Sequence, residues 1–388
     1  MKKFWLFLVI ATFLIVTTGC LPASAEIPND TKGSSSAKGK ITANMTQMWS
    51  AGSNDLLFGS VDQVVTDEDG NIYLLDSQFN EIKVLARGGE LQRMIGRKGD
   101  GPGEFRFATD LMWLPDKNLG VLQSMMGKIV RINIDGVPVG NPVGTFPLVG
   151  QQASGFSNVT EGMSRGGTMV FLQTGLTRDG YMAKNHSNLT GFNAEGKPVV
   201  TFLEHISVMD LGRPQQVEKD RDFPSGGRWT IGPHGRLFVA NHRNQYRITV
   251  FDPQGNLVLN IERDFESWPR SEAEKQAFGE ELFINNGNGR VQVQNVPEDL
   301  EPCIVSIDVL DDGTLWVLNS RGVREISDEI FRSYDVFDAD GKFQAQVAVP
   351  FPGDGQKDRL FFLGDDRIII ASDHSGELEV FCYRIETQ

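Results

Sequence analysis

The sequence predicts an all-β fold, a six-bladed β-propeller of four-stranded antiparallel blades, and two sets of repeated turns lead to this prediction. Turns of the first set each precede a short apolar strand: Asp69-Gly70, His234-Gly235 and Asp312-Gly313. Turns of the second set follow downstream: Gly88-Gly89, Gln254-Gly255 and Asp340-Gly341. A strand–turn–strand unit that recurs along a whole chain is typical of propellers and solenoids rather than of a single-core α/β domain.

The chain begins with a segment that is typical of export signals and is therefore left out of the fold. Lys2 and Lys3 precede an apolar run over residues 4–16. This run is shorter than the about 20 residues that a membrane-spanning helix needs. We expect a signal peptide over residues 1–25, a flexible polar tether over 26–40 and the propeller over 41–388.

Two cleavage sites compete at the end of this leader. Gly19-Cys20 resembles the lipobox of bacterial lipoproteins, in which Cys20 becomes the acylated first residue, although Thr17 departs from that pattern. Ala23-Ser24-Ala25 instead suits ordinary signal-peptidase cleavage and the release of a soluble protein. We favour the lipoprotein, because Gly-Cys falls directly at the end of the apolar run.

The net charge bears on whether nucleic acid is a partner, and the cysteine content bears on whether a disulfide forms. The net charge is −14, and an acidic surface repels phosphate backbones, so we expect no nucleic-acid partner. After Cys20 only Cys303 and Cys382 remain. Export permits a disulfide between them, but no spacing argument brings them together. We therefore favour the interpretation that Cys303 and Cys382 pack inside strands as small apolar side chains.

Six units follow the leader, and their turns define them in order. Unit one (61–105) has four strands with Gly or Asp turns between them: 61–67, 72–75, 81–85 and 91–95. Turns at 115–118 and Asp135-Gly136 define unit two (107–143), and Gly166-Gly167 and Glu195-Gly196 define unit three (156–205). Units four and five span 228–262 and 304–349, and unit six begins near Leu360.

Unit six shows only three strands before the chain stops at Gln388. The segment 41–49 alternates well enough to supply the fourth strand from the other end of the chain. A ring closed in this way leaves no open blade edge. We therefore expect residues 41–49 to pair with the strand that contains residues 377–384.

One segment carries a resemblance to a known family. The run 96–105, Gly-Arg-Lys-Gly-Asp-Gly-Pro-Gly-Glu-Phe, resembles the linker between blades in NHL-repeat propellers. Asp69-Gly70-Asn71-Ile72-Tyr73 and Asp76 match the same repeat. The chain as a whole resembles exported six-bladed propeller proteins of bacteria, and this resemblance implies the fold far more strongly than an activity, because the fold hosts binding modules, lactonases and lyases alike.

A register argument selects three carboxylates as a candidate cation site. Asp62, Asp110 and Asp358 each stand eight residues before the first turn of units one, two and six, which are neighbours in a closed ring. Three carboxylates at the channel mouth would suit a hard divalent cation such as Ca²⁺. The alternative is that all three are solvated residues of the rim.

Two polar insertions, residues 207–227 and 265–301, join units three to four and four to five. In the second, Ser271 and Glu274 resemble a capping box, and residues 273–282 suit a short helix. Connections between blades emerge on the face where the inner strands begin, so both insertions should lie there. Long loops on a rigid scaffold often bind partners, and insertions without a partner are the alternative.

These observations favour an exported, lipid-anchored and monomeric propeller of the periplasm or cell surface that acts as a binding scaffold. It would take a protein or a small-molecule ligand at the inter-blade loop face and contact the membrane only through its anchor. The alternative is a metal-dependent hydrolase or lyase with its site at the channel mouth. We expect no cofactor other than a divalent cation and identify no catalytic residue.

Overall fold

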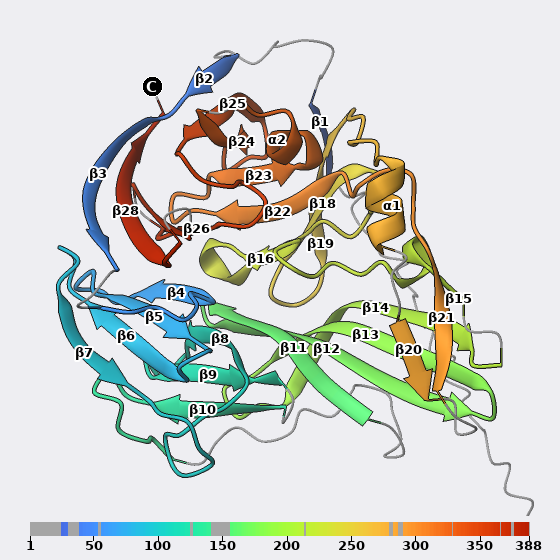
Figure 1. The fold of residues 1–388 in the computed structure, drawn as a ribbon, viewed down its shortest axis with the longest axis horizontal. Coiled ribbons are helices and arrows are strands. Elements are labelled where there is room, and N and C mark those ends of the chain that lie inside the picture. Colours follow the sequence, from blue (N-terminus) through green and yellow to red (C-terminus); the bar gives the residue numbers. More distant parts are fainter. Residues whose placement is uncertain are drawn as a thin grey trace, which may run out of the picture.

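A computed structural model describes residues 25–29, 39–52, 56–124, 127–140, 156–212, 215–278, 282–285, 290–327, 329–364, 366–373 and 376–387. Six mainly antiparallel sheets surround a central axis and form a six-bladed β-propeller, as the sequence predicts (Figure 1). Within the described residues, no helix is both long and apolar enough to cross a membrane.

The blades follow one another around the ring in chain order. Blades 1 to 3 contain the following strands: β4 Gln63–Thr66, β5 Ile72–Asp76, β6 Glu81–Leu85, β7 Leu91–Ile95; β8 Ala108–Trp113, β9 Leu119–Gln123, β10 Lys128–Ile132; β11 Phe156–Arg165, β12 Thr168–Asp179, β13 Met182–Phe192, β14 Pro198–Asp210. Blades 4 to 6 contain the following strands: β16 Trp229–Ile231, β17 Leu237–Val239, β18 Tyr246–Phe251, β19 Leu257–Arg263; β22 Ile304–Val309, β23 Leu315–Asn319, β24 Ile330–Phe337, β25 Phe343–Pro350; β26 Arg359–Phe362, β27 Arg367–Ser372, β28 Glu379–Glu386, β3 Asn44–Ala51.

The apolar core is divided into layers between neighbouring blades rather than gathered in one centre. One cluster joins Tyr73 of blade 1 to Val121 of blade 2, and a comparable cluster fills each of the other five interfaces. The second strand of a blade is covered on both faces, so all residues of β5, β9, β23 and β27 are buried. This is why their sequences are nearly continuous apolar runs without polar alternation.

Cys303 and Cys382 belong to two different layers of this core. Cys303 packs between blades 4 and 5, and Cys382 packs between blades 6 and 1. Both are buried thiols, and no disulfide joins them. They pack as small apolar side chains, which was the favoured reading of the sequence.

The N-terminal segment closes the ring, as predicted, but its residues pair with two blades rather than one. Strand β3 pairs antiparallel with β28, from Asn44 opposite Glu386 to Ala51 opposite Val380. The preceding strand, β2 Lys40–Thr42, pairs in parallel with β25 of blade 5. The prediction that strand pairing with the last blade starts at Ile41 is therefore wrong by three residues, because buried Ala43 marks the crossing from blade 5 to blade 6.

An earlier part of this segment also forms a strand. Residues Ala25–Asn29 (β1) pair in parallel with β19 on the outer edge of blade 4 (Figure 1). Residues 30–38 lie outside the described part of the chain. The boundaries of the signal peptide and the tether therefore stay predictions, although four tether residues, 26–29, are placed on a blade.

Blade 2 is the least regular blade, as its sequence indicates. Three strands form its sheet, and the fourth position is occupied only by a short bridge between Ile132 and Pro138 and by a hydrogen bond from the Val139 N–H to the Arg131 carbonyl. Residues 141–155, in which the fourth strand would continue, lie outside the described residues.

The two insertions form a small substructure of their own. Strand β14 extends to Asp210, so the first insertion starts four residues later than predicted. Strands β15 Gln215–Val217, β20 Leu282–Asn285 and β21 Arg290–Val296 make a separate sheet, next to helix α1 Glu272–Phe278 (Figure 1). The helix begins at the predicted capping box. It is shorter than predicted, because residues Leu282–Asn285 form β20 instead.

A buried ion cluster holds both insertions to blade 4. Glu218 of the first insertion accepts hydrogen bonds from Arg243 Nη2 at 2.7 Å, Arg270 Nη2 at 3.0 Å and the Glu298 N–H at 2.9 Å. Burial raises the pKa of Glu218, but these donors outweigh burial and hold it below its usual value. One carboxylate therefore joins two loops that are distant in sequence.

The ring closure leads to a prediction about truncation. Removal of residues 1–38 deletes only β1 from the described fold, whereas removal of residues 1–51 also deletes β2 and β3 and exposes the edge of β28. We expect the longer truncation to aggregate or to melt on the order of 10 °C lower, since large domains lose about 2–4 °C per kcal/mol. Equal melting temperatures, measured by calorimetry, would contradict the closure.

Candidate functional site: the central channel

One register position of the inner strands brings six side chains to the same level of the central channel. In each blade this position faces the same residue of the second strand; Gln63 lies opposite Leu75, and Asp110 lies opposite Leu122. We call this set the upper ring: Gln63, Asp110, Glu161, Arg228, Ser306 and Arg359. In blades 2, 3 and 5 a β-bulge directly precedes the ring residue.

A second ring lies one pleat further along the same strands. Successive side chains of a strand point to opposite sides. The residue after each upper-ring position is therefore packed between blades, as Leu111 and Trp229 are. The next residue faces the channel again and forms the lower ring: Val65, Met112, Met163, Thr230, Asp308 and Phe361.

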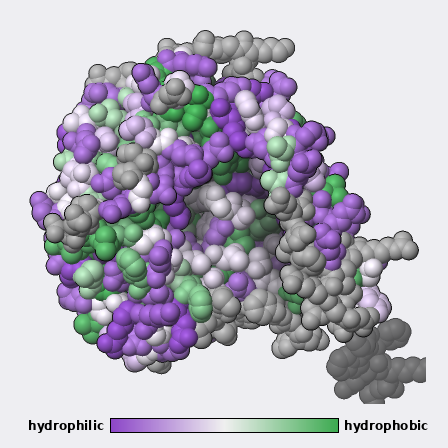
Figure 2. All heavy atoms as spheres, in the orientation of Figure 1, coloured by the Kyte–Doolittle hydropathy of each residue, from purple (hydrophilic) through white to green (hydrophobic). Residues whose placement is uncertain are grey.

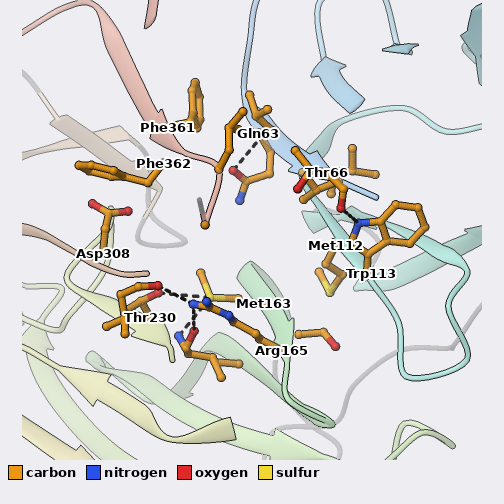
Figure 3. A pocket seen from close by; sticks show the side chains of 18 of the residues that line it. Gln63, Thr66, Met112, Trp113, Met163, Arg165, Thr230, Asp308, Phe361 and Phe362 are labelled. Carbon is orange, nitrogen blue, oxygen red and sulfur yellow. Dashed lines mark hydrogen bonds between the residues drawn. The ribbon is translucent and has the colours of Figure 1, made fainter. Parts of the chain in front are cut away.

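The lower ring surrounds a cavity of ≈ 390 Å³ (Figures 2 and 3). All six inner strands line it, and its lining extends to Asp311 and Gly364, just beyond the ends of β22 and β26. The cavity therefore lies toward the face where the inner strands end. That face is opposite the one on which the sequence analysis placed the partner.

The three predicted cation ligands do not share one register position. Asp110 belongs to the upper ring, whereas Asp62 and Asp358 precede ring residues Gln63 and Arg359 by one. The cause is the first turn of blade 2, in which Lys117 (φ 61°) occupies the left-handed position that Gly70 (φ 81°) occupies in blade 1. A left-handed non-glycine residue is uncommon, so the turn was read one residue too late.

The side chains of Asp62 and Asp358 are committed to local structure. Asp358 Oδ2 accepts hydrogen bonds from Ser372 Oγ at 2.6 Å and from the Asp354 N–H at 2.9 Å. Asp62 Oδ2 accepts from Ser60 Oγ at 2.6 Å and from the Ser77 N–H at 2.9 Å. Across the described ranges, no three His, Cys, Asp or Glu side chains gather as a metal site, so the Ca²⁺ assignment stays a prediction.

Two neighbouring carboxyl groups of the upper ring have raised pKa values. Burial, and then the charge of Glu161, raise the pKa of Asp110 to about 7. Its Oδ2 atom is buried and accepts no hydrogen bond from the described residues. Burial also raises the pKa of Glu161, which accepts hydrogen bonds from Trp229 Nε1 at 2.7 Å and from the Gly226 N–H at 2.8 Å.

The two arginines of the upper ring have different surroundings. Arg228 forms a bidentate ion pair with Asp222, with N···O distances of 2.7 and 2.9 Å, so its charge is matched. Arg359 Nη1 lies 3.6 Å from Asp62 Oδ1, and the Arg359 side chain is half exposed. Burial lowers the pKa of Arg359, and the charges of Asp62 and Asp110 oppose that shift.

The lower ring is mostly apolar and contains one carboxylate. Met112, Met163 and Phe361 form its walls, and Thr230 Oγ1 donates a hydrogen bond to Met163 Sδ at 3.5 Å. Burial raises the pKa of the Asp308 carboxyl to about 6, and the charge of Arg332 acts against that shift. The lower ring thus combines polarizable apolar side chains with one acidic group, Asp308.

Arg165 marks the end of the cavity. Its guanidinium donates hydrogen bonds to the carbonyls of Ile231 and Val309, at 3.2 and 2.5 Å, and it pairs with Asp311 (Figure 3). This side chain of blade 3 therefore connects blades 4 and 5 at the ends of their inner strands. It also neutralises Asp311.

The sequence analysis missed Glu161, Arg359 and Asp308, although a signal for the rings exists. Counting seven residues back from the left-handed turn residue, such as Gly70 or Lys117, reaches the upper ring in blades 1 and 2. The same count reaches Arg228 from Gly235 and Ser306 from Gly313. In blade 3 this count misses the upper ring by one residue. The cause is a shorter turn, because Arg165 and Thr168 face each other with only two residues between them.

The raised pKa of Asp110 leads to a prediction about stability. Its protonated form is favoured in the folded chain, so this contribution is fully present below the unfolded pKa and is lost as the pH rises through about 7. Asp110→Asn should therefore stabilise the protein more at pH 8 than at pH 5, by on the order of 2 kcal/mol. Urea unfolding at both pH values measures this, with Asp135→Asn, at an exposed turn of the same blade, as the control. Parallel pH profiles for the Asp110→Asn variant and the unaltered protein would contradict it.

Comparisons with known proteins agree on the architecture. A sequence family described as a 6-bladed beta-propeller matches residues 52–141. No curated protein sequence matches the chain. Among solved structures, a member of the duf4221 family from Bacteroides vulgatus is similar, with 12% identity, a TM-score of 0.50 and coverage of 89% of this chain and 99% of that one.

Two further solved structures resemble the chain more loosely. A gluconolactonase from Xanthomonas campestris has 14% identity and a TM-score of 0.46, with coverage of 89% of this chain and 90% of that one. A calcium-binding protein, regucalcin, from Agrobacterium tumefaciens has 12% identity and a TM-score of 0.43, with coverage of 89% and 96%. At such identities a likeness concerns the fold alone. The chain is a six-bladed β-propeller whose inner strands surround a charged upper ring and a cavity lined by both polar and apolar groups.

Proposed function

We propose that the protein is a binding module whose central channel holds a small organic ligand. The observation that carries this proposal is the cavity of ≈ 390 Å³, to which all six inner strands contribute. Ligand sites are concave and combine apolar walls with a few well-placed polar groups, and the lining of this cavity provides both. Because the walls belong to strands packed between blades, the site is preformed and little ordering is needed on binding.

The binding test uses three probes of similar size and different charge: 3-phenylpropylamine, 3-phenylpropanol and 3-phenylpropanoate. We expect at least one to bind, measured by saturation-transfer NMR and calorimetry, and Val65→Trp to abolish binding by filling the lower ring. Val199→Trp, at an exposed site (63% accessible), is the matched control. Binding that survives Val65→Trp, in a variant with an unchanged melting temperature, would place the ligand outside the channel.

A second candidate function is acid–base catalysis in the same channel, as a hydrolase or lyase. The observation that favours it is the pair Asp110 and Glu161, whose raised pKa values suit a proton donor beside a carboxylate. The described residues do not fit a resident divalent cation, because Asp358 is bonded elsewhere and Arg359 approaches Asp62. No metal-dependent step is therefore derived. Conversion of a bound ligand, lost in Asp110→Asn, would distinguish this function from binding alone.

A protein partner at the inter-blade loop face is a separate part of the proposal. The insertions that form α1 and the sheet of β15, β20 and β21 are held in place by Glu218, as a rigid surface requires. Loops positioned by a rigid scaffold commonly bind partners. This surface would allow one molecule to bind a small ligand on one side of the ring and a protein on the other.

Export and a lipid anchor complete the proposal, and they rest on the leader sequence alone. Cys20 would be acylated, and the protein would act at the periplasmic or cell-surface side of a membrane. We expect the native protein to partition into detergent, and Cys20→Ser to be left uncleaved or released after Ala25. Mass spectrometry of the unaltered protein checks this assignment; a mature chain that starts at Glu26 would show that no anchor is attached.

A further inference from the structure

The charges that line the cavity do not cancel. Three charged side chains take part in the lining: Arg165, Asp308 and Asp311. Arg165 pairs with Asp311, so these two neutralise each other. Asp308 is left as the unmatched charge of the cavity wall.

Asp308 has no bonded partner of its own within the described part of the chain. Arg332 is the charged group that influences it most, but its guanidinium donates at 2.8 Å to the Gly355 carbonyl and at 2.7 Å to the Asp358 carbonyl. Two of the N–H groups of Arg332 are thus bonded to backbone carbonyls, and Arg332 forms no ion pair with Asp308 among the described residues. A partly buried carboxylate is costly unless it is paired.

The side chains around Asp308 suit an apolar body that carries a positive charge. Figure 3 shows Asp308 and Phe362 on one side of the cavity and Met112 on another. Aromatic rings attract cations through their faces, and methionine sulfur packs favourably against aromatic ligands. An anion would meet Asp308 with like charge, and a neutral ligand would cover the carboxylate without neutralising it.

We propose that the channel ligand is a protonated amine with an apolar body, and that Asp308 is its counter-ion in the lower ring. This inference rests on the proposed function, because it assigns a chemical class to the ligand of the same cavity. The ammonium group would lie against the Asp308 carboxylate, and the apolar body would lie against Met112, Met163 and Phe361. Specificity then follows from charge, since the amine is the only one of the three probes that neutralises the Asp308 carboxylate.

The test compares the same three probes on the full chain by calorimetry at pH 7.5. We expect 3-phenylpropylamine to bind at least about tenfold more tightly than 3-phenylpropanol, and 3-phenylpropanoate to bind most weakly. Asp308→Asn should remove the preference for the amine and leave the affinity for the alcohol unchanged. Asp340→Asn, at an exposed turn of the same blade, is the matched control and should keep the preference.

The outcomes separate this inference from the proposed function. Equal affinity for amine and alcohol, or an amine preference that survives Asp308→Asn, overturns the role of Asp308 while the channel remains a binding site. Absence of binding by all three probes contradicts both. The Asp308→Asn variant should keep its melting temperature, because it removes an unmatched charge, so loss of amine binding is not explained by unfolding.

Discussion

The burial of each second strand between two neighbouring blades is the constraint on which the rest of this structure depends. Strands such as β5 and β27 contact apolar layers on both faces, and their residues are all buried. The innermost strand of each blade pairs with the second strand. This pairing therefore decides which residues of the innermost strand face the channel and which face the layer between blades. A slip of one residue would move Leu111 into the channel and Asp110 into the core. The two rings around the channel are thus a consequence of packing between blades.

This constraint also explains why carboxyl groups with raised pKa values occur in the channel. The ring residues lie where the six inner strands meet around the channel, so they are partly removed from bulk water. Asp110 and Asp308 are held in these surroundings by the backbone register, and burial is the largest cause of the pKa shift of each. Such unmatched groups are unfavourable for stability and are commonly retained where a ligand or a proton transfer uses them.

The ring is stabilised by contacts between segments that are distant in sequence. Strand β3 completes the last blade, and Trp49 of this strand donates a hydrogen bond at 3.0 Å to the Arg87 carbonyl of blade 1. The Trp49 ring packs against Gly89, where a Cβ atom would approach it to 2.6 Å. Glu218 has a comparable role for the insertions, so the loop face and the channel are held on one scaffold.

The sequence by itself determined the blade count, the turns and the closure by an N-terminal strand, because these depend on local turn chemistry and on apolar runs that repeat. It also determined the capping box at Ser271 and Glu274, since both partners lie within one helical turn. The composition of the channel was decided only by the tertiary structure. A left-handed Lys117, a two-residue turn after Arg165 and bulges in three inner strands shift the register by single residues. Because successive side chains of a strand point to opposite sides, a shift of one residue decides whether a side chain faces the channel. Spacing along the chain could therefore not show that Asp110, Glu161 and Arg359 share one ring. Nor could it show that Asp308 lies in the cavity below that ring without an ion-pair partner.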